Sequence, residues 1–394
     1  FCLSRGLGDV YKRQQLSLFQ EPPKTSLVVP PVIQQAIAVG ATLAVSISGG
    51  KDSQAIANLL AAYWRENGLN NPIFALHMDL GRAEWLETPN HVDRIADENE
   101  LWLTVVRRPQ GDLVQEIEDR MEKLAGTGAP FWPSSASRYC TADQKRSQAD
   151  KVYRDVKTAV SPFWPSSTNR YCTSHHKSNQ ADKAYRAYDL IISAEGNRAQ
   201  ESPKRRKDPQ VSIRAQITAK PLRDLPVEEA LATWLTVTDL LDAENYTAIY
   251  ERFPDFTYYI GKEKRPRLAI TWYPIHDWLL EDVWTACGTS AFDVAQRREV
   301  YRYALELEEG GADSNLIGAL KWLAVKQFPA HPAYVFGNER LSCALCILAS
   351  DNDIRNGARH QPELAAHYIR LEEIGGATFK HGRSLAEIIG GDSE

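Results

Sequence analysis

Residues 48–53, SGGKDS, combine the side chains and the backbone freedom that bind phosphate groups. The stretch contains two glycines, a lysine, an aspartate and two serines: Ser48, Gly49, Gly50, Lys51, Asp52 and Ser53. The glycines let the backbone approach a ligand closely, and the lysine adds a positive charge. The common phosphate loop requires G-x-x-x-x-G-K-[ST], and here an aspartate follows the lysine. The spacing therefore predicts a phosphate cradle of a different kind.

The flanking residues predict the elements that position this cradle. Residues 42–47 are small and β-branched, which is typical of a strand. Residues 53–67 carry apolar residues at a helical period and end before Gly68. The first amides of a helix have no internal partners, and the helix dipole favours an anion there. Strand, glycine turn and helix together indicate anion binding at the turn.

The remaining chain predicts an α/β fold, with a parallel sheet covered by helices on both faces. Further strands are expected at 73–79, 101–107 and 189–194, and helices at 86–99, 112–124 and 227–250. In such sheets ligands bind at the carboxyl ends of the strands. The segments at these ends include the candidate binding residues Asp79, Gly81, Gly196 and Arg198. Arg205 follows in a basic run at 204–207, which is also consistent with a solvated turn.

Composition and charge limit the classes of function. The 394 residues are 43% hydrophobic with a net charge of −5, which gives no general attraction to nucleic acid or to an anionic membrane. No apolar run is long enough to span a membrane. We expect residues 1–25 to be a disordered leader of doubtful origin. The expected domains are a nucleotide-binding α/β domain at 26–222, a mostly helical extension at 223–330 and a cysteine-bearing segment at 331–394.

A tandem repeat interrupts the α/β pattern. FWPSSASRYCTADQKRSQADKVYR at 131–154 recurs as FWPSSTNRYCTSHHKSNQADKAYR at 163–186, and two copies are too few for a solenoid. The second copy leads directly into the predicted strand at 189–194. We therefore expect the second copy, with Cys172 and Lys177, to form the site and the first copy, with Cys140, to be looped out.

Six cysteines are too sparse for a disulfide scaffold and fit a reducing cytoplasm. Cys343 and Cys346 form a C-x-x-C pair, and two thiolates cannot complete a four-ligand metal site. Cys172 is the natural third ligand. Three cysteines could hold a [4Fe-4S] cluster with one iron left open, or zinc with His175 or His176. A redox dithiol is a further alternative, and we rank the cluster first.

The SGGKDS stretch resembles the PP-loop of ATP pyrophosphatases, S-G-G-x-D-S, which holds the β,γ-pyrophosphate while ATP is cut between the α and β phosphates. Over about residues 42–350 the chain resembles the phosphoadenosine phosphosulfate (PAPS) reductase family of that superfamily. Besides the loop, the resemblance rests on Asp79-Leu80-Gly81 with Glu84, Arg170-Tyr171-Cys172-Thr173 with Lys177, Gly196-x-Arg198-x-x-Glu201-Ser202-x-x-Arg205, Pro274-x-x-x-Trp278-x-x-x-Asp282-Val283-Trp284 and Arg340-x-x-Cys343-x-x-Cys346.

Two departures from the reductases favour adenylation. The phosphate loop is complete, as in members that cleave ATP, and no cysteine follows Cys346 in these residues. The resemblance then implies an enzyme that binds ATP with Mg²⁺, adenylates an acceptor and prepares it for sulfur transfer. Lys51, Asp52, Lys177 and Arg198 are the implied catalytic residues.

The same resemblance implies a role for each binding residue. The loop amides and Lys51 would hold the pyrophosphate, and the region of Asp79 and Gly81 the adenosine. Arg198 and Arg205 would bind the acceptor or the α-phosphate.

Two other functions stay open. One is a PAPS or adenylylsulfate reductase that releases sulfite. The other is a non-catalytic nucleotide or nucleic-acid binding module, for which the run at 204–207 is the support. The acceptor could be sulfate, nucleic acid or a small molecule, and a sulfur donor or reductant protein is a possible partner.

Overall fold

The computed structural model describes residues 26–127, 129–154, 189–260 and 265–391. Their centre is a six-stranded sheet with the order β3-β2-β1-β4-β6-β5. The strands are β1 Thr42–Ser46, β2 Ile73–Met78, β3 Trp102–Val106, β4 Leu190–Ala194, β5 Val211–Ile213 and β6 Leu268–Trp272. Neighbouring strands are parallel except β5 and β6, which are antiparallel. The predicted α/β fold with a mainly parallel sheet is confirmed.

The predicted strands match the observed ones where the sequence has continuous apolar runs. The predicted strands at 42–47, 73–79, 101–107 and 189–194 are present with ends shifted by one residue or so. The short edge strand β5 was missed. β6, which lies in the part expected to be mostly helical, pairs with β4 along its whole length and is fully buried.

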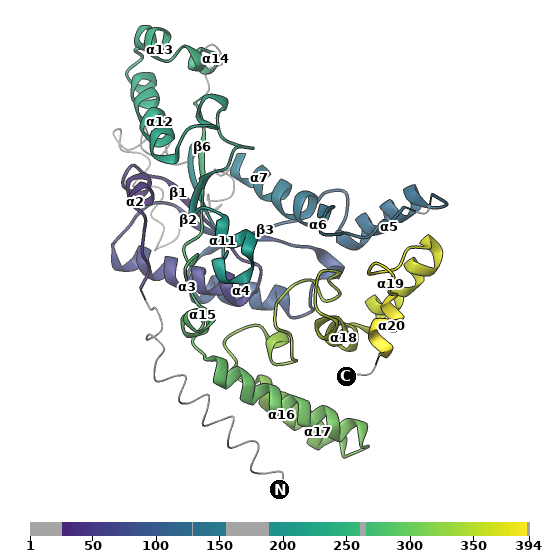
Figure 1. Ribbon diagram of the computed structural model, residues 1–394. Helices are drawn as coiled ribbons and strands as arrows, with labels where there is room; N and C mark the ends of the chain where they lie inside the picture. The colour runs from purple at the N-terminus through teal and green to yellow at the C-terminus, as the bar shows by residue number, and fades with distance from the viewer. Residues whose placement is uncertain (1–25, 128, 155–188, 261–264, 392–394) are drawn as a thin grey trace.

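Helices cover both faces of the sheet, as Figure 1 shows. One face packs against α2 Pro31–Ala38, α3 Lys51–Glu66, α4 Thr88–Glu98, α12 Val227–Asp242 and α15 Leu280–Ala286. The other face, formed by residues such as Ala44, Phe74 and Ile191, packs against α7 Ser147–Arg154. Alternation of side chains along each strand explains why neighbouring residues of β1 reach different layers.

The helix α7 belongs to the first repeat copy, so the prediction that this copy is looped out is wrong. Tyr153 on α7 is fully buried against the sheet, and its hydroxyl lies 2.9 Å from Ser193 Oγ on β4. Asp150 accepts a hydrogen bond of 2.7 Å from Arg214 Nε. Residues 163–186 of the second copy, and residues 1–25, lie outside the described residues. The apolar and aromatic side chains shared by both copies explain why one copy can fill this place.

The C-terminal part of the described chain is helical. It contains α16 Ala291–Glu309, α17 Ser314–Val325, α18 Asp351–His360, α19 Pro362–Gly375 and α20 Leu385–Gly390, and α5 Leu113–Leu124 packs against α19. The hairpin of α16 and α17 projects at the bottom of Figure 1. Among the described residues, no helix is long and apolar enough to cross a membrane.

The helix predicted at 227–250 is two helices. α12 ends at Asp242, and α13 spans Tyr246–Arg252. Glu244 between them has a φ of 53°, a conformation that a continuous right-handed helix excludes. α14 Thr257–Ile260 follows α13.

The strand order creates a switch point between β1 and β4. From β1, the chain proceeds outward through β2 to β3, and β4 then starts the other half of the sheet. Open parallel sheets bind ligands in the crevice at the carboxyl ends of the strands beside such a point. The SGGKDS loop follows β1 and Gly196 follows β4, so both lie at this crevice.

Candidate functional site

The loop after β1 is shaped by its own serines and glycines. Gly49 has a φ of 76°, in the left-handed region that glycine enters without strain. Ser53 Oγ donates a hydrogen bond of 2.8 Å to the Gly50 carbonyl and accepts one of 3.1 Å from the Ser48 N–H. The loop therefore turns tightly into helix α3, which begins at Lys51.

The charged residues of the loop form a buried chain of alternating charge. Lys51 Nζ lies 3.0 Å from Asp52 Oδ2, and Arg198 Nε donates to the other oxygen, Asp52 Oδ1. Lys51 and Arg198 are each 4% exposed. Burial alone would raise the pKa of Asp52, but the charges of Lys51 and Arg198 outweigh it, so its pKa lies below the usual value. Asp52 therefore holds two cations at the start of α3.

Lys51 also contacts two aromatic rings, and the motif that contains one of them, Trp284, did not indicate this contact. Its Nζ lies 5.8 Å from the ring centre of Trp284 on α15 and 5.5 Å from that of Tyr334. The Lys51 N–H donates a hydrogen bond of 3.1 Å to the Tyr334 hydroxyl. Burial lowers the pKa of Lys51, but the contacts with Tyr334 and Asp52 outweigh it and raise the pKa. The ammonium group is therefore charged and held by both ions and rings.

Gly196 lets the β4 end approach the loop closely. A Cβ at this position would lie 2.8 Å from the carbonyl carbon of Asp52 and 3.0 Å from the Ser53 nitrogen. Only glycine allows this backbone contact, which brings Arg198 onto Asp52. The predicted residues Gly196 and Arg198 are thus placed beside the loop, and their arrangement depends on the switch point.

Three guanidinium groups gather at this edge. Arg205 forms an ion pair with Glu201, and Arg340 Nη2 donates a hydrogen bond of 3.1 Å to the Glu201 carbonyl. Burial lowers the pKa of Arg205, and the charges of Arg340 and Arg198 lower it further. This excess of positive charge suits a phosphate or sulfate group. Arg340 stands in the R-x-x-C motif before Cys343, but the motif did not indicate its position.

Asp79 and Gly81 line a separate cavity at the ends of β2 and β3. The cavity measures about 510 Å³, within the range of about 300–1,000 Å³ typical of small-molecule pockets. Its other lining residues are Arg82, Arg107, Arg108, Pro109, Gly111, Asp112 and Gln115. Gly81 has a φ of 65°, and its N–H donates a hydrogen bond of 2.6 Å to Asp79 Oδ1. The two predicted residues therefore form one wall of a cavity of nucleoside size.

A smaller cavity joins the phosphate loop to the cysteines. It measures about 40 Å³ and is lined by Ser48, Leu80, Glu84, Thr88, Lys145, Leu341, Ser342 and Cys343. The volume is enough for a water molecule or two but not for a nucleotide. Because Ser48 and Cys343 line the same cavity, Cys343 lies next to the phosphate loop. The order of the motifs along the sequence does not establish this proximity.

A third cysteine near the C-x-x-C pair comes from the first repeat copy. Cys140 on α6 Tyr139–Thr141 and Cys343 pack against one apolar cluster with Ile354 and Tyr368. Burial raises the pKa of Cys140, and the neighbouring Cys346 raises it further. Lys145, in the π-helical turn Ala142–Arg146, has the position in its copy that Lys177 has in the second. Cys172 and Lys177 themselves lie outside the described residues, so their roles stay predictions.

The Cys343 thiol at this cavity is neutral. Burial raises the pKa of Cys343, and the nearby Cys346 adds to that effect. A neutral thiol is a poor nucleophile and a poor metal ligand until a cation lowers its pKa. Cys287 is also buried, but its Sγ donates to the Lys51 carbonyl at 3.2 Å, which identifies it as a packing contact on α3.

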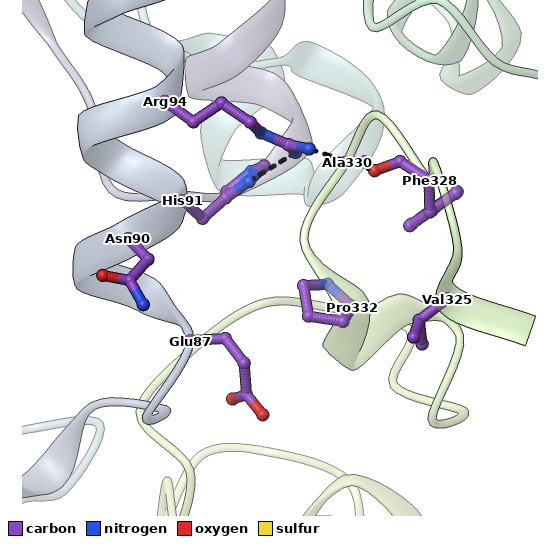
Figure 2. A pocket seen from close by; sticks show the side chains of 8 residues that line it. All are labelled: Glu87, Asn90, His91, Arg94, Val325, Phe328, Ala330 and Pro332. Atoms are coloured by element: carbon purple, nitrogen blue, oxygen red, sulfur yellow. Dashed lines mark hydrogen bonds between the residues drawn. The ribbon is translucent and has the colours of Figure 1, made fainter. Parts of the chain in front are cut away.

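The segment that follows α17 is held against helix α4 by hydrogen bonds. Arg94 on α4 donates hydrogen bonds to the carbonyls of Phe328, at 3.3 Å, and Pro329, at 2.8 Å. Figure 2 shows this contact beside a cavity of about 310 Å³. Burial and the charge of Arg94 lower the pKa of His91 to about 3, so its ring is neutral. These contacts fix the segment that carries Tyr334.

A comparison with sequence models of protein families identifies the family of this chain. The sequence model of the phosphoadenosine phosphosulfate reductase domain matches residues 42–294, more than half of the chain. The chain belongs to the PAPS reductase family. This is a PP-loop family of nucleotide-binding proteins, and the matched range includes the phosphate loop, Asp79, Gly196 and Arg198. It ends before Tyr334, Arg340 and the C-x-x-C pair. A search of curated proteins found no match.

Proposed function

We propose that this member of the PAPS reductase family cleaves ATP between the α and β phosphates and adenylates an acceptor. An acceptor oxygen attacks the α-phosphorus, the bond from phosphorus to the bridging oxygen of the β-phosphate breaks, and pyrophosphate leaves. The observation that carries the proposal is the intact loop, with Lys51 and Arg198 both paired to Asp52. Preorganised positive charge at a developing pyrophosphate is the main catalytic effect that such a loop offers.

The size of one cavity supports this assignment. The space beside Asp79 and Gly81 has nucleoside size, and the loop amides with Lys51 would hold the β and γ phosphates. Arg198, Arg205 and Arg340 would bind the α-phosphate or an anionic acceptor. Mg²⁺ would accompany the ATP phosphates, as it does where phosphates supply most of its ligands. Lys145 would supply the positive charge that the resemblance implies for Lys177.

The thiols support a sulfur-transfer step after adenylation. A zinc ion with bonds of about 2.3 Å would draw three thiolates to within about 3.8 Å of one another. In the described ranges, Cys140, Cys343 and Cys346 do not form a group of ligand atoms within 4.8 Å, so an ion-sized site is not preformed. The group that we propose here is the larger [4Fe-4S] cluster. These cysteines would hold three of its irons, and the fourth iron would be open to sulfur.

The decisive experiment measures pyrophosphate and AMP release from Mg-ATP by the anaerobically purified chain. We expect release in the wild type and a loss of about 10²–10³-fold in Lys51→Ala, because one charge-stabilising group is removed. Lys321→Ala on α17, which removes a lysine paired with Glu308 at 2.7 Å, is the matched control and should be unaffected. Equal release by wild type and Lys51→Ala would refute the proposal.

A sulfonucleotide reductase is the second candidate, favoured by the free thiols beside the loop. It predicts sulfite release from a sulfonucleotide with no pyrophosphate from ATP. The raised pKa of Cys343 disfavours it, because reduction needs a thiolate to attack sulfur. Sulfite release that is lost in Cys343→Ser would establish this activity instead.

A further inference from the structure

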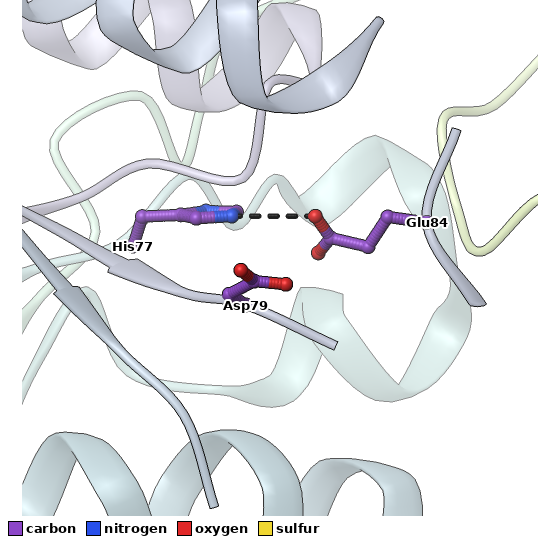
Figure 3. Close-up of side chains that lie close together, drawn as sticks. All are labelled: His77, Asp79 and Glu84. Atoms are coloured by element: carbon purple, nitrogen blue, oxygen red, sulfur yellow. Dashed lines mark ion pairs between the residues drawn. The ribbon is translucent and has the colours of Figure 1, made fainter. Parts of the chain in front are cut away.

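Three polar side chains meet at the end of β2, and two of them, His77 and Glu84, have no part in the proposed reaction. His77 lies on β2, Asp79 follows it, and Glu84 follows the short turn Gly81–Ala83. One ligand atom from each lies within 4.8 Å of the others. His77 and Asp79 are 3% and 6% exposed, and the Glu84 side chain is 11% exposed. Figure 3 shows the three groups pointing toward one another.

The hydrogen bond of His77 fixes which of its nitrogens faces the cluster. His77 Nδ1 lies 3.0 Å from the Ile47 carbonyl oxygen, which only accepts, so Nδ1 carries a proton. Nε2 faces Glu84 Oε2 at 3.3 Å, where the two groups form an ion pair when the ring carries a second proton, and a bound cation would take the place of that proton. Within the described part of the chain neither atom has a hydrogen-bond partner. A histidine that donates one N–H to a backbone carbonyl is the common form of a metal ligand.

We propose that His77, Asp79 and Glu84 bind a divalent transition-metal cation next to the phosphate loop. Ligand atoms about 2.1 Å from one ion lie about 3.0–3.4 Å apart in octahedral or tetrahedral geometry, and the His77–Glu84 separation of 3.3 Å matches. An imidazole with two carboxylates suits Mn²⁺, Fe²⁺ or Zn²⁺, whereas Mg²⁺ prefers oxygen and water ligands. The site is thus distinct from the Mg²⁺ of a nucleotide.

Arg107 competes with the cation for Asp79. Its Nε and Nη2 atoms each lie 2.5 Å from Asp79 Oδ2. The Arg107 side chain is 72% exposed, so it can turn into solvent without breaking the core. Asp79 Oδ1 stays bonded to the Gly81 N–H, which orients the carboxylate as a second-shell hydrogen bond does. Removing the Arg107 charge should therefore strengthen cation binding.

The position of the proposed cation, between the phosphate loop and Cys343, indicates which chemistry it could supply. Glu84 also lines the small cavity that Ser48, Lys145 and Cys343 share. A cation held by three protein ligands keeps open positions for an oxygen or sulfur atom of another ligand. It would act there as a Lewis acid at the boundary between the phosphate loop and the thiols. This inference does not depend on ATP cleavage.

The test titrates the metal-free full chain with Mn²⁺ in the absence of nucleotide and follows the free ion by electron paramagnetic resonance. We expect one site in the wild type, binding at least tenfold weaker in His77→Gln and Glu84→Gln, and binding several-fold tighter in Arg107→Gln. Nitrogen coupling to bound Mn²⁺ should be seen in the wild type and lost in His77→Gln. His367→Gln is the matched control, since His367 Nε2 lies 2.7 Å from Glu118 in another ion pair.

Absence of a site in the wild type, or equal affinity in all variants, would overturn the inference. His77 would then be the protonated partner of Glu84 in a structural ion pair. If His77→Gln fails to fold, Glu84→Gln and the exposed Arg107→Gln still decide the question. No nucleotide is present, so failure of the adenylation proposal leaves this result unaffected.

Discussion

The two sides of the candidate site are built in different ways. The phosphate loop comes from one continuous stretch, and its charges are paired in advance through Asp52. The cysteine side combines α6 with the distant segment Leu341–Cys346, and burial keeps the thiols of Cys140 and Cys343 neutral. The loop is therefore ready to receive an anion. The cysteine side acquires charge only when a cation or cluster lowers the pKa of its thiols.

The largest expected effect tests which repeat copy supplies the third cysteine ligand of the proposed cluster. Cys140→Ser and Cys343→Ser should lose most of the iron bound after anaerobic reconstitution, because each removes one of three ligands. Cys172→Ser is the matched comparison and should retain it. Iron content and the visible absorption of the cluster measure the result. Loss of iron in Cys172→Ser alone, with Cys140→Ser intact, would return the site to the second copy.

This comparison also explains what the sequence could predict. The strands β1 to β4, the loop, Gly196 and Arg198 are indicated by local patterns, because strand, turn and helix signals act over neighbouring residues. The choice of repeat copy depends on how Tyr153 packs beneath the sheet, and both copies carry the same tyrosine. The local patterns around this tyrosine are nearly the same in both copies, so they do not distinguish the copies as tertiary packing does.

The contacts that the sequence did not predict share one property, which is that each joins residues from separate elements. Tyr334 bonds the Lys51 N–H across 283 positions in the sequence, and Trp284 reaches the same lysine from another helix. Glu84 belongs to a family motif, but its position beside His77 depends on how the turn after β2 folds back. No periodicity or spacing encodes such contacts. The wall of the site is therefore less predictable than its loop.

A smaller effect tests the contact that joins β4 to the loop. Gly196→Ala should lower the free energy of unfolding by about 1–3 kcal/mol, because the new Cβ would meet the Asp52 backbone at 2.8 Å. ATP affinity should fall with it, since Arg198 would shift from Asp52. Denaturant unfolding and nucleotide titration measure the two effects.

Gly318→Ala on α17 is the control for this substitution. Nothing lies within 4 Å of a Cβ there, so the change should stabilise the helix by about 0.5–1 kcal/mol. Equal unfolding free energies and equal ATP affinities in the two variants would mean that the loop tolerates displacement of β4. The loop would then be less preorganised than its paired charges imply.

The smallest effect concerns Tyr334, the residue through which the C-terminal segment reaches the loop. Tyr334→Phe keeps the ring beside Lys51 but removes the acceptor for the Lys51 N–H, which should cost about 1 kcal/mol of unfolding free energy. The freed N–H is then available to phosphate, so the Kd for ATP should fall a few-fold.

Tyr301→Phe provides the matched control, because that hydroxyl lies 3.1 Å from His360 Nε2 and does not contact the loop. It should lose similar stability without any change in ATP affinity. Tighter binding in Tyr334→Phe alone would mean that the tyrosine hydroxyl occupies the place of a phosphate oxygen. Weaker binding would instead make Tyr334 a ligand contact, so that the loop side, like the cysteine side, would depend on the C-terminal segment for its chemistry.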